Sequence, residues 1–193
     1  MSEKESVDRR VVRTKKALWS ALLDLIKERD WDDINVRGIC DRADVARSSF
    51  YLHFHNKQDL LDFGFSSGRK ELSERFDALK EEQALRAFLD WLVDHLAQSG
   101  TLFQSRNGQL NPAILQRFKT VVGDLLAHQL RRQAPDLTRE QNQFITGGVF
   151  AILEDWLCER HRLRPAEVVH IVEAEIERHV SWTASSHRDR GQQ

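Results

Sequence analysis

The fold of this chain is decided by a short stretch that reads VRGICDRA (36–43), DVA (44–46) and RSSFYLHF (47–54). Two short helices joined by a three-residue turn form a helix-turn-helix, whose second helix can enter the major groove of DNA. The positions expected to hold the two helices together are apolar: Ile39, Ala43, Val45, Phe50 and Phe54. The outer face of the second helix is then left with Arg47, Ser48, Ser49, Leu52 and His53. This face offers hydrogen-bonding groups and an apolar group able to contact a thymine methyl.

The rest of the chain has the same helical pattern. Apolar residues recur at three- and four-residue steps, as in residues 18–26, 85–96 and 114–126, with no sustained alternation of apolar and polar residues. Glycine and proline fall between these stripes, where helices are expected to end. The pattern predicts an all-α protein of about nine helices. We expect a three-helix DNA-binding domain over residues 1–56 and a helical effector-binding and dimerisation domain over residues 57–193.

Composition narrows the class of protein. The chain has 193 residues, of which 40% are hydrophobic and 31% charged, a balance typical of a soluble globular protein. Its two cysteines, Cys40 and Cys158, are too few for a disulfide framework and fit a reducing compartment. The first ten residues lack the apolar run of a signal peptide, and residues 144–153 are too short a run to span a bilayer. We therefore expect a cytoplasmic protein with no membrane partner.

Residues 11–61 resemble the DNA-binding domain of the TetR family of bacterial transcriptional repressors. The resemblance rests on the helix-turn-helix stretch and on its flanks, Asn35 before it and Asn56-Lys57-x-x-Leu60-Leu61 after it. It implies a homodimer that binds a near-palindromic double-stranded DNA operator and is released by a small-molecule effector of unknown identity. It also implies that base edges are faced by Arg47, Ser48, Ser49 and Leu52. Phosphates would be contacted by Tyr51, His55 and Lys57, with Asn35 at the phosphate-facing start of the second helix.

Two residues depart from the family pattern. Asp44 stands where the family usually has glycine, because the backbone there often has a positive φ, which Asp tolerates better than most residues. Ala46 stands where a hydroxyl residue usually caps the recognition helix. The absence of this hydroxyl cap is expected to cost about 1 kcal/mol of helix stability. Neither change removes a group that could contact DNA.

Charge supports DNA binding only locally. Residues 1–60 carry 12 Lys and Arg against 11 Asp and Glu, so this part of the chain is almost neutral. Residues 9–16, however, hold five basic residues and no acidic one. This cluster is either a solvated helix face or a DNA contact.

The last two helices are expected to form a dimer interface. Residues 144–153 are apolar nearly all round, so this helix must be covered on more than one side. Glycines inside a helix cost about 1 kcal/mol each relative to alanine, which favours a close helix contact at this place. The predicted interface comprises Gly147, Gly148, Ala151, Val169, Val172, Ile176 and Val180. A monomer with a buried central helix is the alternative.

An effector pocket is expected among aromatic side chains, which ordinary core packing would also explain. The candidates are Phe88, Trp91, His95, Phe103, Phe118, Val121 and Phe144. Trp91 and His95 are four residues apart and so share one helix face.

Enzyme chemistry finds little support in the sequence. A single Glu167-x-x-His170 pair is one motif short of a di-iron site, and Cys158 with His161 has no second metal-ligand pair. We therefore expect no catalytic activity, no metal and no cofactor. The alternatives to a ligand-responsive repressor are a partner-controlled regulator without a small-molecule effector and a helical protein-interaction module.

Overall fold

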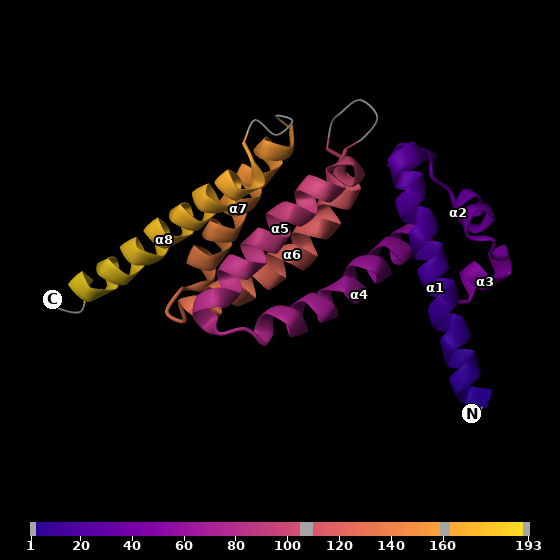
Figure 1. Cartoon of the computed structure of the whole chain (residues 1–193), viewed down its shortest axis with the longest axis horizontal. Helices are drawn as coiled ribbons and strands as arrows, with labels where there is room; N and C mark the ends of the chain where they lie inside the picture. Colours follow the sequence, from indigo (N-terminus) through magenta and orange to yellow (C-terminus); the bar gives the residue numbers. More distant parts are fainter. Residues whose placement is uncertain (1–2, 105–109, 159–162, 191–193) are drawn as a thin grey trace. The chain divides into compact units, whose positions relative to one another are not determined.

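The computed structural model describes residues 3–104, 110–158 and 163–190 of the chain (Figure 1). In these residues it has eight α-helices and a 3₁₀ turn: α1 (Glu3–Glu28), η1 (Trp31–Asp33), α2 (Val36–Ala43), α3 (Arg47–Tyr51), α4 (Lys57–Asp77), α5 (Glu81–Phe103), α6 (Pro112–Gln133), α7 (Arg139–Cys158) and α8 (Pro165–Arg190). The described residues contain no strand, and an isolated bridge joins Gln104 to Leu110. The all-α prediction is therefore confirmed, and the number of helical elements is close to the expected nine.

The chain divides into two compact units. The first unit contains residues 1–68 and 101–117, and the second contains residues 69–100 and 118–193, so the divisions fall within α4, α5 and α6. The functional boundary expected after residue 56 stays a prediction, because a division by contacts does not test it.

In the first unit, α1 supplies the surface on which the helix-turn-helix is built. Its buried stripe is formed by Leu18, Ala21, Leu22, Leu25 and Ile26, and α2 packs against it with Ile39 fully buried. Figure 1 shows α2 and α3 lying along one side of α1. The rings of Phe50 and Phe54 lie 5.6 Å apart, and Phe54 lies 5.4 Å from Phe63 of α4. Aromatic burial therefore joins α3 to the beginning of α4.

Helix α4 approaches α1 closely at a glycine. A Cβ atom placed on Gly64 would overlap ring carbons of Trp19, far inside van der Waals contact. The Trp19 ring also packs edge-on against Phe65 at 6.1 Å. A glycine at position 64 is thus required by the packing of the indole on α4. One turn later, a Cβ on Gly68 would meet no atom within 4 Å.

In the second unit, α5 to α8 bury a core of branched and aromatic side chains. Helix α7 buries Ile145, Val149, Phe150 and Leu153, and it packs against α8. The buried polar side chain Asn142 donates a hydrogen bond from Nδ2 to the carbonyl oxygen of Ala127 at 3.0 Å, so its burial is compensated. Among the described residues, no helix is both long enough and apolar enough to cross a membrane.

Candidate nucleic-acid interface

The turn between α2 and α3 has the geometry that the sequence predicts. Asn35 caps α2, because its Oδ1 accepts a hydrogen bond from the Gly38 N–H at 2.9 Å. Asp44 ends the helix in the left-handed conformation, with φ 53° and ψ 47°, and the Val45 N–H donates to the Cys40 carbonyl at 3.0 Å. The positive φ expected at Asp44 is confirmed.

Helix α3 begins without a side-chain cap. Ala46 occupies the N-cap position, and its side chain has no oxygen to accept a hydrogen bond from the first turn. Its carbonyl oxygen accepts from the N–H groups of Ser49 and Phe50. The start of α3 therefore depends on packing rather than on capping.

Packing divides α3 into two faces. Phe50 is fully buried, and its ring contacts those of Tyr51 and Phe54. On the other face, the side chains of Tyr51 and Leu52 are 53% and 79% exposed, although both are large and apolar. Arg47 and Ser48 are also exposed, and Ser49 is half-buried. All the residues predicted to face base edges are therefore exposed or half-buried, and they lie between the start of α3 and Leu52, which follows its last residue.

The next turn carries His55 and a second helix cap. Asn56 Oδ1 accepts a hydrogen bond from the Asp59 N–H at 2.9 Å, which caps the start of α4. The Asp59 carboxylate in turn accepts from the His55 N–H at 3.0 Å and lies 2.9 Å from His55 Nδ1. The hydrogen bond from the His55 main chain holds the pKa of Asp59 below its usual value. His55 keeps Nε2 for another partner.

Lys57 has a structural role that sequence reasoning missed. Its Nζ donates to the carbonyl oxygens of Trp31 at 2.5 Å and of Ile34 at 2.8 Å, and it lies 4.6 Å from the centre of the Trp31 ring. Burial lowers the pKa of this ammonium. The side chain thus joins the start of α4 to the η1 turn. The sequence alone does not indicate this lysine-aromatic pair, because residues 31 and 57 come together only in the folded chain.

The predicted pocket residues fall into separate groups. Within the second unit, neighbouring rings form a continuous cluster: Phe76, Phe88, Trp91, His95, Phe118 and Phe150. His95 is stacked on Trp91 at 5.2 Å and on Phe118 at 6.3 Å, and burial lowers its pKa. Val121 is half-buried on α6, and Phe103 is buried in the first unit. Phe144 is 68% exposed on α7, and its ring contact is with His179 of α8.

The predicted interface residues also fall into two groups. Gly147, Gly148 and Ala151 are exposed on α7 on the same face as Phe144, and added Cβ atoms on the glycines would meet nothing within 4 Å. Val169, Val172 and Ile176 of α8 are buried within the chain, and Val180 is half-buried. One face of α7 is therefore apolar and uncovered in the single chain.

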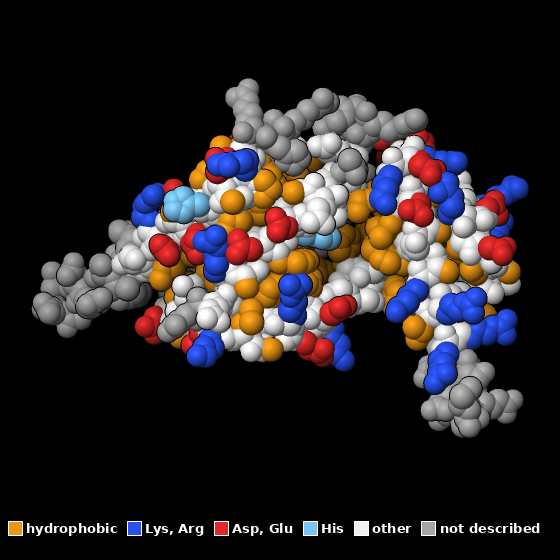
Figure 2. All heavy atoms as spheres, viewed as in Figure 1, with side chains coloured by type: hydrophobic (Ala, Val, Ile, Leu, Met, Phe, Trp, Pro, Cys, Tyr) orange, Lys and Arg blue, Asp and Glu red, His pale blue; other side chains and the backbone are white. Residues whose placement is uncertain are grey.

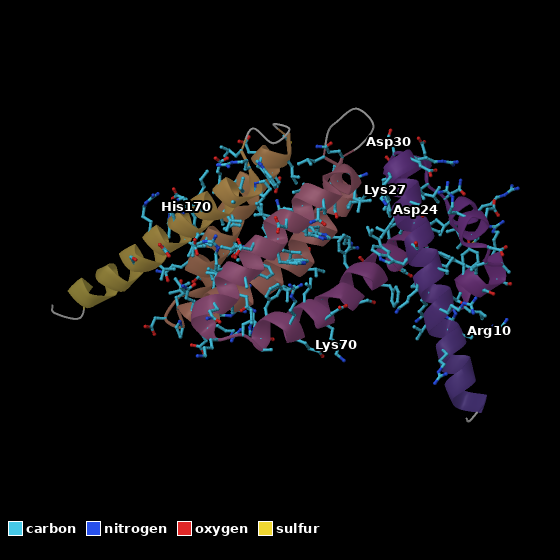
Figure 3. The ribbon with its side chains drawn as sticks, viewed as in Figure 1. Arg10, Asp24, Lys27, Asp30, Lys70 and His170 are labelled. Atoms are coloured by element: carbon cyan, nitrogen blue, oxygen red, sulfur yellow. The ribbon has the colours of Figure 1, made fainter. Side chains whose placement is uncertain are left out.

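The residues considered for catalysis have other environments. Glu167 accepts hydrogen bonds from the main chain and guanidinium of Arg164, and His170 is exposed on α8 (Figure 3). Burial raises the pKa of the Cys40 thiol, while Cys158 is exposed and His161 lies outside the described residues. Among the described residues, no three His, Cys, Asp or Glu side chains are grouped so as to hold a metal ion.

Comparison with known proteins agrees with this geometry. Residues 18–62 match the family model described as bacterial regulatory proteins, tetR family. A stretch of 61 residues is 44% identical to the HTH-type transcriptional regulator YxbF of Bacillus subtilis (strain 168). This match covers 31% of the present chain and 16% of the length of YxbF.

Solved structures show that the likeness in fold extends over most of the chain. A TetR transcriptional regulator from Streptococcus agalactiae 2603V has a TM-score of 0.66 at 23% identity, covering 90% of this chain and 99% of that one. The fatty acid degradation regulator FadR from Bacillus halodurans has a TM-score of 0.62 at 20% identity, covering 84% and 94% respectively. The family model thus matches the helices that carry the exposed α3 face, and the remaining helices have the fold of the same regulators. Residues 18–62 thus match the tetR family of bacterial regulatory proteins, and most of the chain shares the fold of solved TetR regulators.

Proposed function

We propose that the chain is a homodimeric repressor that binds a near-palindromic operator and is released when a small molecule binds in its second unit. The observation that carries this proposal is the exposed face of α3, where Leu52 is 79% and Tyr51 53% exposed although both are apolar enough to be buried. Large apolar side chains beside Arg47 and Ser48 suit a major groove, which offers both hydrogen-bonding edges and thymine methyl groups.

The DNA contacts divide into those that read sequence and those that hold the backbone. Arg47 can grip a guanine through two hydrogen bonds, and Ser48, Ser49 and Leu52 contact neighbouring base edges. The Tyr51 hydroxyl, the free Nε2 of His55 and the start of α2 at Asn35 contact phosphates. Lys57 donates two of its three N–H groups to carbonyl oxygens and has one left for a phosphate.

The exposed face of α7 supports a twofold dimer. Phe144 is 68% exposed there, and Gly147, Gly148 and Ala151 leave a shallow surface on which the same helix of a second copy can pack closely. A self-complementary patch of this kind closes a dimer without leaving a free end. Two recognition helices then meet successive major grooves, which lie about 34–36 Å apart.

The effector site is proposed at His95 and the rings on either side of it, Trp91 and Phe118. The imidazole has no hydrogen-bond partner among the described residues, and burial lowers its pKa, which favours the neutral ring that can both donate and accept. Effector bound there would favour a conformation with the wrong spacing of recognition helices. A coupling of about 1–3 kcal/mol is enough for 5–150-fold release of the operator.

A binding comparison of two variants tests the DNA contacts. The protein is titrated onto labelled DNA from the region upstream of its own gene and onto a shuffled duplex of equal length. We expect Arg47→Ala to lower the preference for the upstream DNA by about 1–3 kcal/mol, because a base contact is lost. Tyr51→Phe should weaken binding to both duplexes equally, because only a phosphate contact is lost.

The control is Arg178→Ala, which removes an exposed arginine from α8 that pairs with Glu175. Its binding to both duplexes should equal that of the parent. If Arg47→Ala and Tyr51→Phe both bind as the parent does, α3 is not the recognition helix and the proposal fails.

A further inference from the structure

The amino-terminal part of α1 forms one wall of a groove beside the helix-turn-helix. The groove has a volume of about 600 Å³ and is lined on α1 by Arg9, Arg10, Arg13, Thr14 and Ala17. Its other wall is the turn Ala43-Asp44-Val45 that leads into α3. Arg47, the first residue of the recognition helix, follows Val45 by two positions. A ligand in this groove would therefore lie next to the start of α3.

Among the described residues that line the groove, the net charge is positive. Three arginines face one carboxylate, Asp44, among the lining residues. Arg9, Arg10 and Arg13 form no ion pair with any carboxylate that the structure describes. By contrast, Arg42 pairs with Glu28 at 2.6 Å and Arg37 pairs with Asp41 at 3.7 Å. Guanidinium groups left without a partner are suited to phosphate oxygens, which they bind through paired hydrogen bonds.

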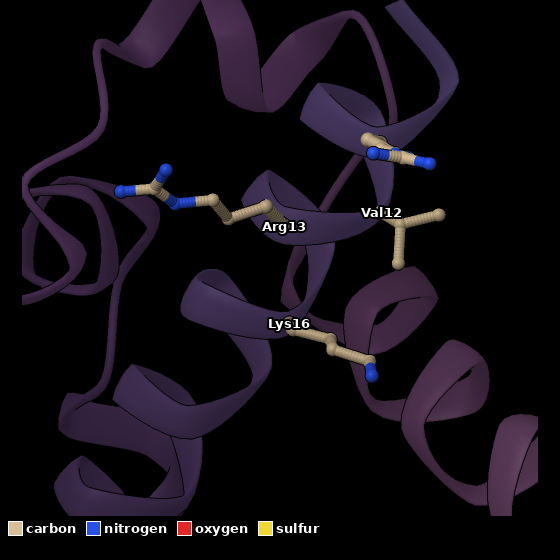
Figure 4. A pocket seen from close by; sticks show the side chains of 4 residues that line it. Val12, Arg13 and Lys16 are labelled. Atoms are coloured by element: carbon tan, nitrogen blue, oxygen red, sulfur yellow. The ribbon is translucent and has the colours of Figure 1, made fainter. Parts of the chain in front are cut away.

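Basic side chains also extend to a second side of α1. Arg9, Val12, Arg13 and Lys16 line a further surface hollow, and Figure 4 shows Arg13 pointing to the opposite side of the helix from Val12 and Lys16. Figure 2 shows Lys and Arg side chains gathered beside this end of α1. The basic surface thus extends from the groove to the other side of α1.

The partner that this surface fits is DNA rather than a lipid bilayer. A helix that lies on a membrane needs an exposed apolar face beside its basic one. The apolar stripe of α1, represented by Leu18, Leu22 and Leu25, is buried in the core of the first unit. Only Val12 among the large apolar residues of its described side chains is more than a third exposed.

We infer that Arg10 and Arg13 bind backbone phosphates of the DNA strand next to the recognition helix, so that α1 is a second DNA-binding element. This inference rests on the proposed function and adds a contact that is independent of base sequence. Such a contact raises affinity for all DNA and fixes the angle at which α3 enters the groove. Because the helix-turn-helix unit is almost neutral over residues 1–60, these arginines supply much of its attraction to DNA.

The test uses the full chain and a labelled random-sequence duplex, so that no operator is needed. The affinity of the double variant Arg10→Ala/Arg13→Ala is measured between about 50 and 200 mM salt, where binding to random DNA depends on phosphate contacts alone. We expect affinity to fall about 10-fold or more, and the slope of log affinity against log salt to become shallower by about 1.8, since each lost phosphate contact removes about 0.9.

Two further variants separate charge from folding. Lys27 lies towards the other end of the same helix from Arg10, as Figure 3 shows, and its side chain pairs with Asp24. The salt slope of the Lys27→Ala variant should therefore equal that of the parent. Arg10→Lys/Arg13→Lys should recover most of the slope, because it restores the charge. Thermal unfolding of all variants confirms that the helix is intact, as expected for alanine, a strong helix former.

The outcomes distinguish this inference from the proposed function. A parental slope in Arg10→Ala/Arg13→Ala, or loss of the slope in Lys27→Ala as well, would overturn the role of α1. Failure of the parent to prefer upstream over shuffled DNA would instead count against the proposed operator, with the slope on random DNA still deciding the inference. A parent that binds no random DNA even at low salt would overturn both.

Discussion

Each of the two units has a helix face on which apolar or small side chains are exposed to solvent. The two faces differ in the residues that surround these side chains. On α3, exposed Tyr51 and Leu52 stand beside exposed Arg47, next to a groove lined by three arginines without ion-pair partners among the described residues. On α7, exposed Phe144 stands beside two glycines and an alanine. The first surface suits a polyanion with apolar methyl groups, and the second suits another close-packed helix.

Glycine marks the same difference. At Gly64, in the first unit, a side chain would strike Trp19, so the requirement for glycine is already met inside the chain. At Gly147 and Gly148, in the second unit, a side chain would meet open space, so no contact with the described residues explains why a helix carries two residues that weaken it. A glycine on an exposed helix face without a close contact inside the chain therefore points to a neighbour outside it.

We expect the largest effect from a substitution on the exposed face of α7. Gly148→Glu places a charge on the exposed face of α7, where it fits a single chain but must be desolvated in a close-packed dimer at a cost of about 3 kcal/mol or more. We expect the dimer dissociation constant to rise about 100-fold or more, measured by sedimentation, and operator affinity to fall with it.

The control for this variant is Gln133→Glu, which adds the same charge at the exposed end of α6. It should leave the dimer intact. Unchanged mass for Gly148→Glu would show that α7 does not form the interface.

An intermediate effect sharpens the comparison of glycines. Gly64→Ala should destabilise the protein by about 1–2 kcal/mol, because strain against Trp19 outweighs the gain in helix propensity. Gly68→Ala, one turn later in open space, should stabilise it by about 0.5–1 kcal/mol. Urea unfolding of the two variants measures both changes. Equal stability of the two would mean that the Trp19 ring moves aside without cost.

The smallest effect concerns the start of the recognition helix. Ala46→Thr supplies a hydroxyl that can accept a hydrogen bond from the first turn of α3, and it should raise stability by about 1 kcal/mol. Ala46→Val has the same shape without the hydroxyl and is the matched control. If both variants change the midpoint of unfolding equally, capping is not what α3 lacks.

Local features of the amino-terminal unit were open to prediction because they depend on neighbours in the chain. The cap at Asn35, the left-handed Asp44 and the missing cap at Ala46 follow from residues within a few positions of each other. The same holds for the division of α3 into a buried face at Phe50 and an exposed face at Leu52. Periodicity sufficed because a short helix on a core has only one way to bury its apolar side.

Residues far apart in the chain were harder to place. The sequence indicated Lys57 as a phosphate contact but gave no sign that its ammonium group also contacts the Trp31 ring and two carbonyl oxygens 23 and 26 positions away. Aromatic spacing grouped Phe144 with the pocket candidates, but the structure places it on the surface beside His179. A helical stripe shows that a residue is apolar, not which neighbour covers it.

By itself, the sequence determined the all-α class, the helix-turn-helix and the side of α3 that faces outward, because these follow from helix period and turn chemistry over short distances. Only the tertiary structure decided which apolar residues are covered and which arginines have no ion-pair partner among the described residues. It separated the buried Val169 and Val172 from the exposed Gly147 and Gly148, and it placed Arg10 and Arg13 across a groove from the turn at Asp44. Burial and ion pairing depend on contacts between distant parts of the chain, which no local pattern contains.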